Sequence, residues 1–259
     1  MEILGIDIGG TGIKGALVDT SLGKLVTPRE RIKTPQPSTP ENVAVTVQEL
    51  VNLFKWRAPV GAGFPAVVRE GVVFTAANID PTWVGVNADV LFQQFTGCPF
   101  TVKNDADAAG FAEMRFGAGR EHQKGVVMIL TLGTGIGSAV FSNGVLVPNL
   151  ELGHVELKGK DAETITSDAV RQRKELSFKE WARRVQTYLQ YLERIFWPDL
   201  FIIGGGGSKH FAKIAPYIKL RTNIIPAHFL NEAGIIGAAL FAEERLSSSA
   251  SASKNSTLG

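Results

Sequence analysis

Two glycine-rich turns carry the kinds of group that bind phosphate in proteins. The first lies in residues 7–15 and the second in residues 131–137, and each follows an apolar run with β-branched residues. Successive backbone N–H groups of such a turn can form a concave site for phosphate oxygens. We therefore expect phosphate contacts from these residues of the two turns: Gly9, Gly10, Thr11, Gly12, Lys14, Thr131, Gly133, Thr134 and Gly135.

The first turn also has the spacing of a dinucleotide-binding fingerprint, at Gly10, Gly12 and Gly15. That fingerprint requires a helix directly after the glycines, whereas residues 13–18 predict a strand that returns in a hairpin. A purely structural β-turn is the other alternative. The charges of Asp7 and Lys14 argue against it, because a turn needs neither.

The two turns are copies of one unit, since residues 10–13 (GTGI) recur as residues 133–136. Leu130 stands in the second copy where Asp7 stands in the first, so the carboxylate is not needed to build the turn. Beside a phosphate site, a carboxylate can hold Mg²⁺ directly or through water. We expect this role for Asp7, with a surface carboxylate at a strand end as the alternative.

Residues 104–107 (NDAD) lie where a short strand passes into a helical pattern. An aspartate at this place is often only a helix N-cap. Asp105 and Asp107 cannot both be the cap, which leaves one carboxylate for other chemistry. An ionised aspartate that faces a hydroxyl can orient it and accept its proton during phosphoryl transfer. We expect Asp105 to be this group.

A third polar cluster comprises residues 151–154 (ELGH) and Glu163. Carboxylates and an imidazole that converge on one site suit a ligand with many hydroxyl groups, which needs hydrogen-bond acceptors. A metal site is a weaker alternative, because the segment has no cysteine and lacks the spacing of zinc motifs. A solvated loop is the remaining alternative, and it fits Glu156 better than Glu151 or His154.

The composition excludes several functional classes. The chain has 259 residues with 27 Lys and Arg against 25 Asp and Glu, a net charge too small for a nucleic-acid-binding surface. One cysteine, Cys98, allows neither an intrachain disulfide nor a cysteine zinc site. No apolar run is long enough to span a membrane, and no leader segment is visible, so we expect a cytoplasmic protein.

The motifs must be positioned by alternating strands and helices. Apolar periodicity and capping signals predict strands over 3–8, 13–18, 25–33, 59–64, 100–102, 125–132, 138–147 and 200–203, and helices over 40–56, 105–116, 178–197 and 231–244. Thr39 and Ser177 are the expected N-caps, the latter in a capping box with Glu180. Residues 66–100 have only short apolar pieces and are expected to be irregular. The Ser- and Ala-rich tail, residues 247–259, is expected to be disordered.

Taken together, these motifs resemble the ROK family of sugar kinases, within the actin and hexokinase superfamily. The resemblance is carried by residues 7–11 (DIGGT), 63–65 (GFP), 104–105 (ND), 132–137 (LGTGIG), 151–154 (ELGH), 204–206 (GGG) and 231–234 (NEAG). It implies a two-lobed α/β fold of the actin-like ATPase (ribonuclease H-like) type, with duplicated β units and a central cleft. The expected lobes are residues 1–104, against which the helix at 234–245 packs, and residues 105–233.

The resemblance also implies the roles of individual residues. Asp105 is the expected catalytic base, and the expected sugar contacts are Gly63, Asn78, Asn104, Asp105, Glu151, His154 and Glu163. The glycine run at 204–207 would lie where the nucleotide donor sits, which adds Gly205 and Gly206 to the donor site. Lysines and arginines could form a basic track into the cleft, or only an ordinary solvated surface: Lys14, Lys103, Arg171, Arg173, Lys174 and Lys209.

The chain departs from many ROK members in one respect, because residues 155–163 lack the family's cysteine-rich zinc motif. Without that motif, and with residues 161–163 (DAE), it is similar to the polyphosphate glucokinases of the family. This similarity implies phosphoryl transfer from inorganic polyphosphate, with ATP as a second donor and Mg²⁺ as cofactor, to the 6-hydroxyl of glucose. It also implies a homodimer that binds neither nucleic acid nor membrane.

Three other functions are open at this point. An ATP-dependent ROK kinase of another hexose or an amino sugar would use the same motifs with a different donor. A sugar-responsive regulator would need a DNA-binding extension, yet the first strand begins at Ile3. A sugar-binding protein without catalysis would be expected to have lost Asp105.

Overall fold

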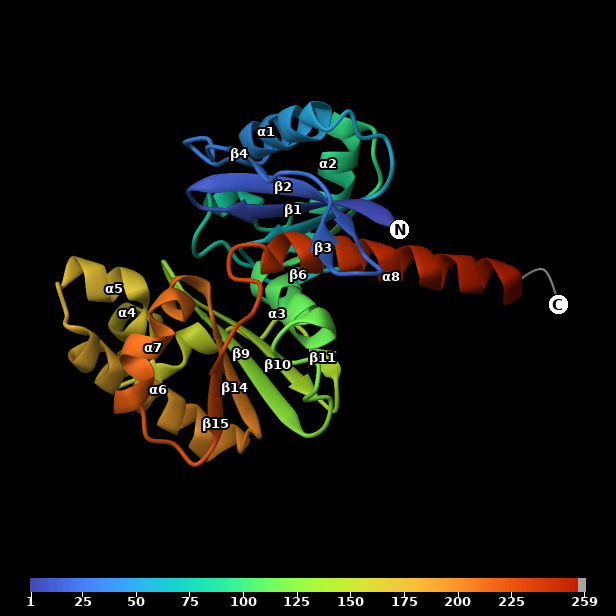
Figure 1. Ribbon diagram of the computed structural model, residues 1–259. Helices are drawn as coiled ribbons and strands as arrows, with labels where there is room; N and C mark the ends of the chain where they lie inside the picture. Colours follow the sequence, from blue (N-terminus) through green and yellow to red (C-terminus); the bar gives the residue numbers. More distant parts are fainter. Residues whose placement is uncertain (256–259) are drawn as a thin grey trace. The chain divides into compact units, whose positions relative to one another are not determined.

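The computed structural model describes residues 1–255, and the chain divides into two compact units (Figure 1). Unit 1 comprises Met1–Ala112 together with the segment from Glu232 onward, and unit 2 comprises Glu113–Asn231. The boundary falls inside helix α3 (Asp105–Phe116), whose first residues belong to unit 1. No helix within residues 1–255 combines the length and the apolar character that crossing a bilayer requires.

Unit 1 is built on a mixed sheet in the order β3-β2-β1-β5-β8, with β4 paired to β2. Its strands are β1 (Glu2–Gly9), β2 (Gly12–Asp19), β3 (Lys24–Leu25), β4 (Glu30–Ile32), β5 (Val60–Phe64) and β8 (Phe100–Asn104). Strands β1, β5 and β8 are parallel, whereas β2 returns antiparallel from β1 through the first glycine turn. The carboxyl ends of the three parallel strands therefore lie at one edge of the sheet.

Helices α1 (Pro40–Leu53) and α2 (Ala88–Thr96) cover one face of this sheet (Figure 1). Thr39 caps α1 with Pro40 in its first turn, as predicted. The prediction of irregular structure throughout 66–100 was wrong, because α2, the 3-10 helix η1 (Pro81–Trp83) and the short strands β6 (Val68–Arg69) and β7 (Val72–Val73) form there. Trp83 and Phe92, from η1 and α2, are buried in the core of unit 1.

Helix α8 (Ala233–Asn255) runs along the other face of the sheet (Figure 1). Its backbone approaches the strands so closely that a Cβ at Gly5 or Gly61 would overlap a carbonyl oxygen of the helix. The structure corrects the expected disorder from residue 247, since the helix continues to Asn255, and residues 256–259 lie outside the described part. Alanine favours this continuation, and the hydroxyls of Ser247, Ser248 and Ser249 donate to carbonyls four residues earlier.

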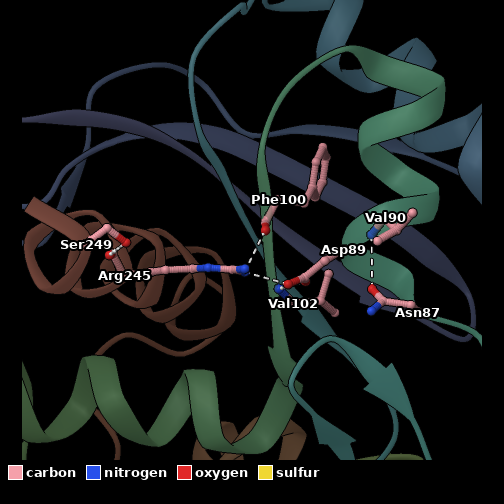
Figure 2. Close-up of polar contacts among 7 residues, drawn as sticks. All are labelled: Asn87, Asp89, Val90, Phe100, Val102, Arg245 and Ser249. Atoms are coloured by element: carbon pink, nitrogen blue, oxygen red, sulfur yellow. Dashed lines mark hydrogen bonds and ion pairs between the residues drawn. The ribbon is translucent and has the colours of Figure 1, made fainter. Parts of the chain in front are cut away.

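The outer edge of β8 is closed by side chains instead of another strand (Figure 2). Asp89 Oδ1 accepts the N–H of Val102 at 2.7 Å, and Arg245 Nη1 donates to the carbonyl of Phe100 at 3.0 Å. The two side chains also form an ion pair with 2.5 Å between Arg245 Nη1 and Asp89 Oδ2. An exposed strand edge is a template for association with other chains, and this pair binds two backbone groups of the edge, the N–H of Val102 and the carbonyl of Phe100.

Unit 2 contains a second mixed sheet in the order β11-β10-β9-β14-β15. Its strands are β9 (Val126–Leu132), β10 (Ile136–Ser142), β11 (Val145–Val147), β14 (Leu200–Gly204) and β15 (Asn223–Pro226). The β9–β10 hairpin encloses the second glycine turn, and β14 lies parallel to β9. This arrangement repeats β1, β2 and β5 of unit 1, so the predicted duplicated β units are confirmed.

The long helix α6 (Phe178–Phe196) packs against this sheet and begins at the predicted capping box of Ser177 and Glu180. Trp181 and Tyr188 of α6 are completely buried in the core. Shorter elements complete the unit: η2 (Leu152–His154), β12 (Glu156–Leu157), β13 (Lys160–Asp161), α4 (Glu163–Thr166), α5 (Asp168–Arg173), η3 (Gly205–His210), α7 (Phe211–Ile214) and η4 (Ala215–Tyr217).

Candidate active site

The first glycine turn lies at the carboxyl end of β1, with its two charged residues paired. Lys14 Nζ donates to Asp7 Oδ2 at 2.9 Å, because the β1–β2 register places these residues opposite each other. Asp7 also lies against Gly234, where a Cβ would be 3.3 Å from Asp7 Oδ1. The carbonyl of Asn78 lies near Gly10, with 3.5 Å to the position of a Cβ there. Unit 1 therefore brings Asn78 to the phosphate turn.

Arg31, from β4, also contacts this turn. Its guanidinium donates to the carbonyl of Thr11 at 3.0 Å and lies so close to Gly12 that a Cβ there would overlap it. The β2–β4 register, in which Arg31 pairs with Lys14, puts it there. No local motif around residue 31 indicates this position, because it depends on how β4 returns to the sheet.

Asp105 begins α3 directly after β8 and lies next to the carboxyl end of β5. A Cβ at Gly63 would be 3.3 Å from the Cα of Asp105, so the missing side chain at Gly63 leaves room for it. Asp105 is half-buried, and its Oδ1 accepts the N–H of Ala106 at 2.7 Å. A carboxylate at a helix N-terminus is stabilised by the helix dipole. Asp7, Gly63 and Asp105 thus follow three neighbouring parallel strands.

Asn104 has a structural role that corrects the predicted helix cap. Its Oδ1 accepts the N–H of Asp107 at 2.9 Å, and its Nδ2 donates to the carbonyl of Ala66 at 3.0 Å. Asn104 therefore caps α3, in place of Asp105 or Asp107. This leaves the carboxylate of Asp105 outside the capping position, while the sugar contact of Asn104 remains a prediction.

The second glycine turn and the glycine run after β14 come together in unit 2. Thr131 is the register partner of Gly204, and a Cβ at Gly205 would be 3.1 Å from the backbone N of Leu132. Gly205 has φ +66°, a left-handed conformation that favours glycine. The candidate donor residues Gly133, Thr134, Gly135 and Gly206 lie on these adjoining segments.

Glu163, from the start of α4, contacts this second turn. Its Oε2 accepts the N–H of Ile136 at 3.2 Å and occupies the space where a Cβ at Gly135 would lie. The family resemblance predicts a sugar contact for Glu163, whereas the observed bond is to the phosphate turn. The carboxylate of Glu163 therefore lies beside the turn and close enough to Glu151 and His154 to affect their pKa values.

The segment 151–154 is held in place by buried packing. A Cβ at Gly153 would overlap the carbonyl oxygen of Ile136, and the hydroxyl of Tyr188 donates to the carbonyl of Leu152 at 3.2 Å. Burial raises the pKa of Tyr188, which keeps this hydroxyl protonated as a donor. The support from α6 fixes the backbone between Glu151 and His154.

Glu163 lies close enough to Glu151 and His154 to influence the protonation of both. Burial raises the pKa of Glu151, and the charge of Glu163 raises it further, while His154 opposes this shift. The Asp161 carboxylate, 3.0 Å from His154 Nδ1, raises the pKa of that imidazole, with smaller contributions from Glu163 and Glu151. Unit 2 thus brings together three predicted sugar contacts and adds Asp161, which holds the imidazole.

We expect Asp161→Asn to lower the pKa of His154 toward 6.5, because the largest cause of its elevation is removed. A raised folded-state pKa means that the pair stabilises the fold fully below pH 6.5 and loses this contribution as the pH rises through the raised value. An NMR titration of the His154 ring in both proteins measures the change, with Asp161→Glu as the variant that keeps a carboxylate. Identical titration curves for wild type and Asp161→Asn would contradict the assignment.

The residues of the predicted basic track differ in their surroundings. Arg171 Nε donates to the buried carboxylate of Asp168 at 2.6 Å, so its charge is offset within the fold. Arg173, Lys174 and Lys209 are exposed in unit 2. Lys103, in unit 1, lies over the ring of Phe241 with 5.9 Å from Nζ to the ring centroid.

Comparison with known proteins identifies the relatives of the chain. A sequence model of the ROK family matches residues 3–169. The polyphosphate glucokinase of Mycobacterium tuberculosis (strain CDC 1551 / Oshkosh) is 49% identical over 237 residues, which are 91% of this chain and 89% of the relative.

Solved structures agree with this similarity. The inorganic polyphosphate/ATP-glucomannokinase from Arthrobacter sp. strain KM matches with a TM-score of 0.91 and 48% identity, over 94% of this chain and 99% of that one. A ROK family glucokinase from Streptomyces griseus has the same fold at 24% identity, with a TM-score of 0.82 over 94% and 100% of the two chains. The actin-like α/β fold class predicted from the sequence is therefore confirmed, and the chain is a member of the ROK family.

Proposed function

We propose that this chain is a glucose kinase that uses inorganic polyphosphate as its phosphoryl donor. The observation that carries the proposal is the 49% identity to a polyphosphate glucokinase over 91% of this chain and 89% of that one. Two features of unit 1, the first phosphate-binding turn and a carboxylate at a helix start, support it, as do the second turn and the cluster of sugar-binding candidates in unit 2. The products are glucose 6-phosphate and a polyphosphate chain that is one unit shorter.

Asp105 is the proposed catalytic base. Its carboxylate accepts the proton of the glucose 6-hydroxyl as the hydroxyl oxygen bonds to the terminal phosphorus, and the bridging P–O bond breaks toward the remaining chain. The bond from Ala106 N–H to Asp105 Oδ1 orients the carboxylate. The proposed sugar contacts are Gly63, Asn78, Asn104, Glu151, His154 and Glu163.

The glycine turns hold the donor in this proposal. Backbone N–H groups and the hydroxyls of Thr11 and Thr134 face the phosphoryl oxygens and offset charge that develops on them during transfer. The Lys14 ammonium adds a positive charge, and its ion pair with Asp7 fixes its position. Gly205, Gly206 and Lys209 complete the donor site on unit 2.

Mg²⁺ is the proposed cofactor, with Asp7 as its protein ligand. No group of three or more His, Cys, Asp or Glu that could hold a metal ion occurs within residues 1–255. This fits Mg²⁺ in a phosphate site, where one or two carboxylates suffice and water and phosphate oxygens supply the other ligands. When bound, the ion would neutralise phosphate charge next to the first turn.

The proposal has further parts that rest on the family resemblance. ATP serves as a second donor, and the enzyme acts as a homodimer in the cytoplasm. The thiol of Cys98 is free and buried, which is compatible with a reducing compartment.

A coupled assay for glucose 6-phosphate, with polyphosphate and ATP supplied separately, tests the proposed donor. We expect turnover with polyphosphate, Mg²⁺ and glucose, abolished when EDTA removes the metal. Mannose belongs in the acceptor series, since the Arthrobacter relative is named as a glucomannokinase. Activity with ATP and none with polyphosphate would contradict the proposal and indicate an ATP-dependent sugar kinase.

A further inference from the structure

Two cationic side chains and a histidine ring surround the ring of Phe178 in unit 2. Lys213 Nζ lies 4.7 Å from the centroid of this ring, the His210 ring 4.9 Å and Arg171 Cζ 5.1 Å. On the next residue of α6, Lys179 Nζ lies 6.0 Å from the centroid of Tyr217. We call Arg171, Lys179, His210 and Lys213, with the ring of Phe178, the cation wall.

The two lysines of the cation wall, Lys179 and Lys213, have no ion-pair partner in the described part of the chain. The nearby carboxylates of Asp168 and Glu180 are engaged, one by Arg171 and the other by the capping box with Ser177. Lys179 and Lys213 are exposed, and neither forms an ion pair with a described residue. Two exposed lysines without an ion pair to a described residue, on a protein of net charge only +2, create a local field that attracts an anion.

Two short elements connect the cation wall to the proposed donor glycines. Helix α5 begins at the second glycine turn, where Ala169 N–H donates to the carbonyl of Gly133 at 3.1 Å, and carries Arg171. The 3-10 helix η3 begins at Gly205 and ends at His210, with Lys213 one turn further on. Both paths end at the ring of Phe178: the backbone rises about 3 Å from Ala169 to Arg171 along α5 and about 10 Å from Gly205 to His210 along η3.

We propose that the cation wall binds the part of a polyphosphate donor that extends beyond the phosphates held by the glycine turns. This inference rests on the proposed function. Inorganic polyphosphate carries negative charge along its whole length, so a long chain leaving the turns meets the cation wall with charge to be neutralised. ATP ends in an uncharged nucleoside and has nothing equivalent to place there. The cation wall therefore favours long polyphosphate over short polyphosphate and ATP.

The test is the double variant Lys179→Gln/Lys213→Gln, which removes two exposed charges and keeps the side-chain stems. We expect the KM for long-chain polyphosphate to rise about tenfold, from two weak surface ion interactions. The KM values for tripolyphosphate, ATP and glucose, and the kcat with each donor, should stay within about twofold. Added salt should raise the long-chain KM of the wild type more steeply than that of the double variant, because salt screens exposed charges.

Lys124→Gln is the matched control, since Lys124 is an exposed lysine of the same unit outside the cation wall and the donor site. Its KM for long-chain polyphosphate should equal that of the wild type. The inference is overturned if the double variant keeps the wild-type KM for long chains, or if its KM rises equally for long chains, tripolyphosphate and ATP. A wild-type protein that forms no glucose 6-phosphate from any polyphosphate would instead overturn the proposed function.

Discussion

Asp105→Ala is expected to lower kcat for glucose phosphorylation by roughly 10²–10⁴-fold, the usual contribution of a positioned general base. The substitution removes the carboxylate of the first residue of α3, while the cap supplied by Asn104 stays in place. The helix start should therefore keep its structure, and glucose binding should remain measurable by calorimetry. The loss should appear in kcat with either donor, because the base acts on the sugar hydroxyl.

Asp105→Asn is the variant that separates chemistry from local structure. Its side-chain oxygen can still accept the N–H of Ala106, which Asp105 binds at 2.7 Å. An amide cannot take the hydroxyl proton, so we expect the same decrease in kcat as for alanine. Turnover near the wild-type value in either variant would refute the assignment of Asp105 as the base.

Gly61→Ala is expected to destabilise unit 1 by about 3 kcal/mol, at the upper end of the usual cost of overpacking. A Cβ at this position of β5 would overlap the carbonyl of Ala238, and neither backbone can move without separating α8 from the sheet. For a unit of this size we expect Tm to fall by roughly 10 °C. Thermal unfolding followed by circular dichroism measures the change.

Gly15→Ala is the matched control for this prediction. Gly15 also lies inside a strand, β2, but the nearest atom to an added Cβ is the side-chain atom Leu50 Cδ2 at 3.0 Å, and the nearest backbone atom, the carbonyl oxygen of Gly5, is 3.3 Å away. A side chain can turn away at small cost, so we expect a clearly smaller decrease in Tm. Equal decreases for the two variants would show that backbone contact with α8 is not the cause.

Much of the fold follows from local signals in the sequence. Thr39 with Pro40, and Ser177 with Glu180, specify helix starts through hydrogen bonds between residues only three apart, so they are visible without tertiary structure. Helix α2 was missed although its signals were present. Asn87 caps its start and Gly97, at φ +73°, ends it, but its nine residues are too few for a clear apolar period.

The residues of the candidate site also fall into two groups, those that local sequence motifs predict and those that only the folded chain brings together. The glycine turns could be predicted because each is a continuous segment with its own chemistry. Arg31 could not, because only the pairing of β4 with β2 brings its guanidinium to Thr11. The sequence leaves the cap of α3 open, because Asn and Asp serve equally well as caps and nothing local chooses between Asn104 and its two aspartate neighbours. The contact of Glu163 with Ile136 likewise joins residues from different elements.

The closure of β8 by Arg245 has a consequence for synthesis of the protein on the ribosome. Unit 2 is one continuous stretch, whereas the sheet of unit 1 receives α8 only from the last part of the chain. Arg245 follows Asn104 by 141 residues, which takes roughly 7–28 s at ordinary rates of translation. Throughout that interval the carbonyl of Phe100, on the outer edge of β8, lacks the arginine donor that it has in the finished protein.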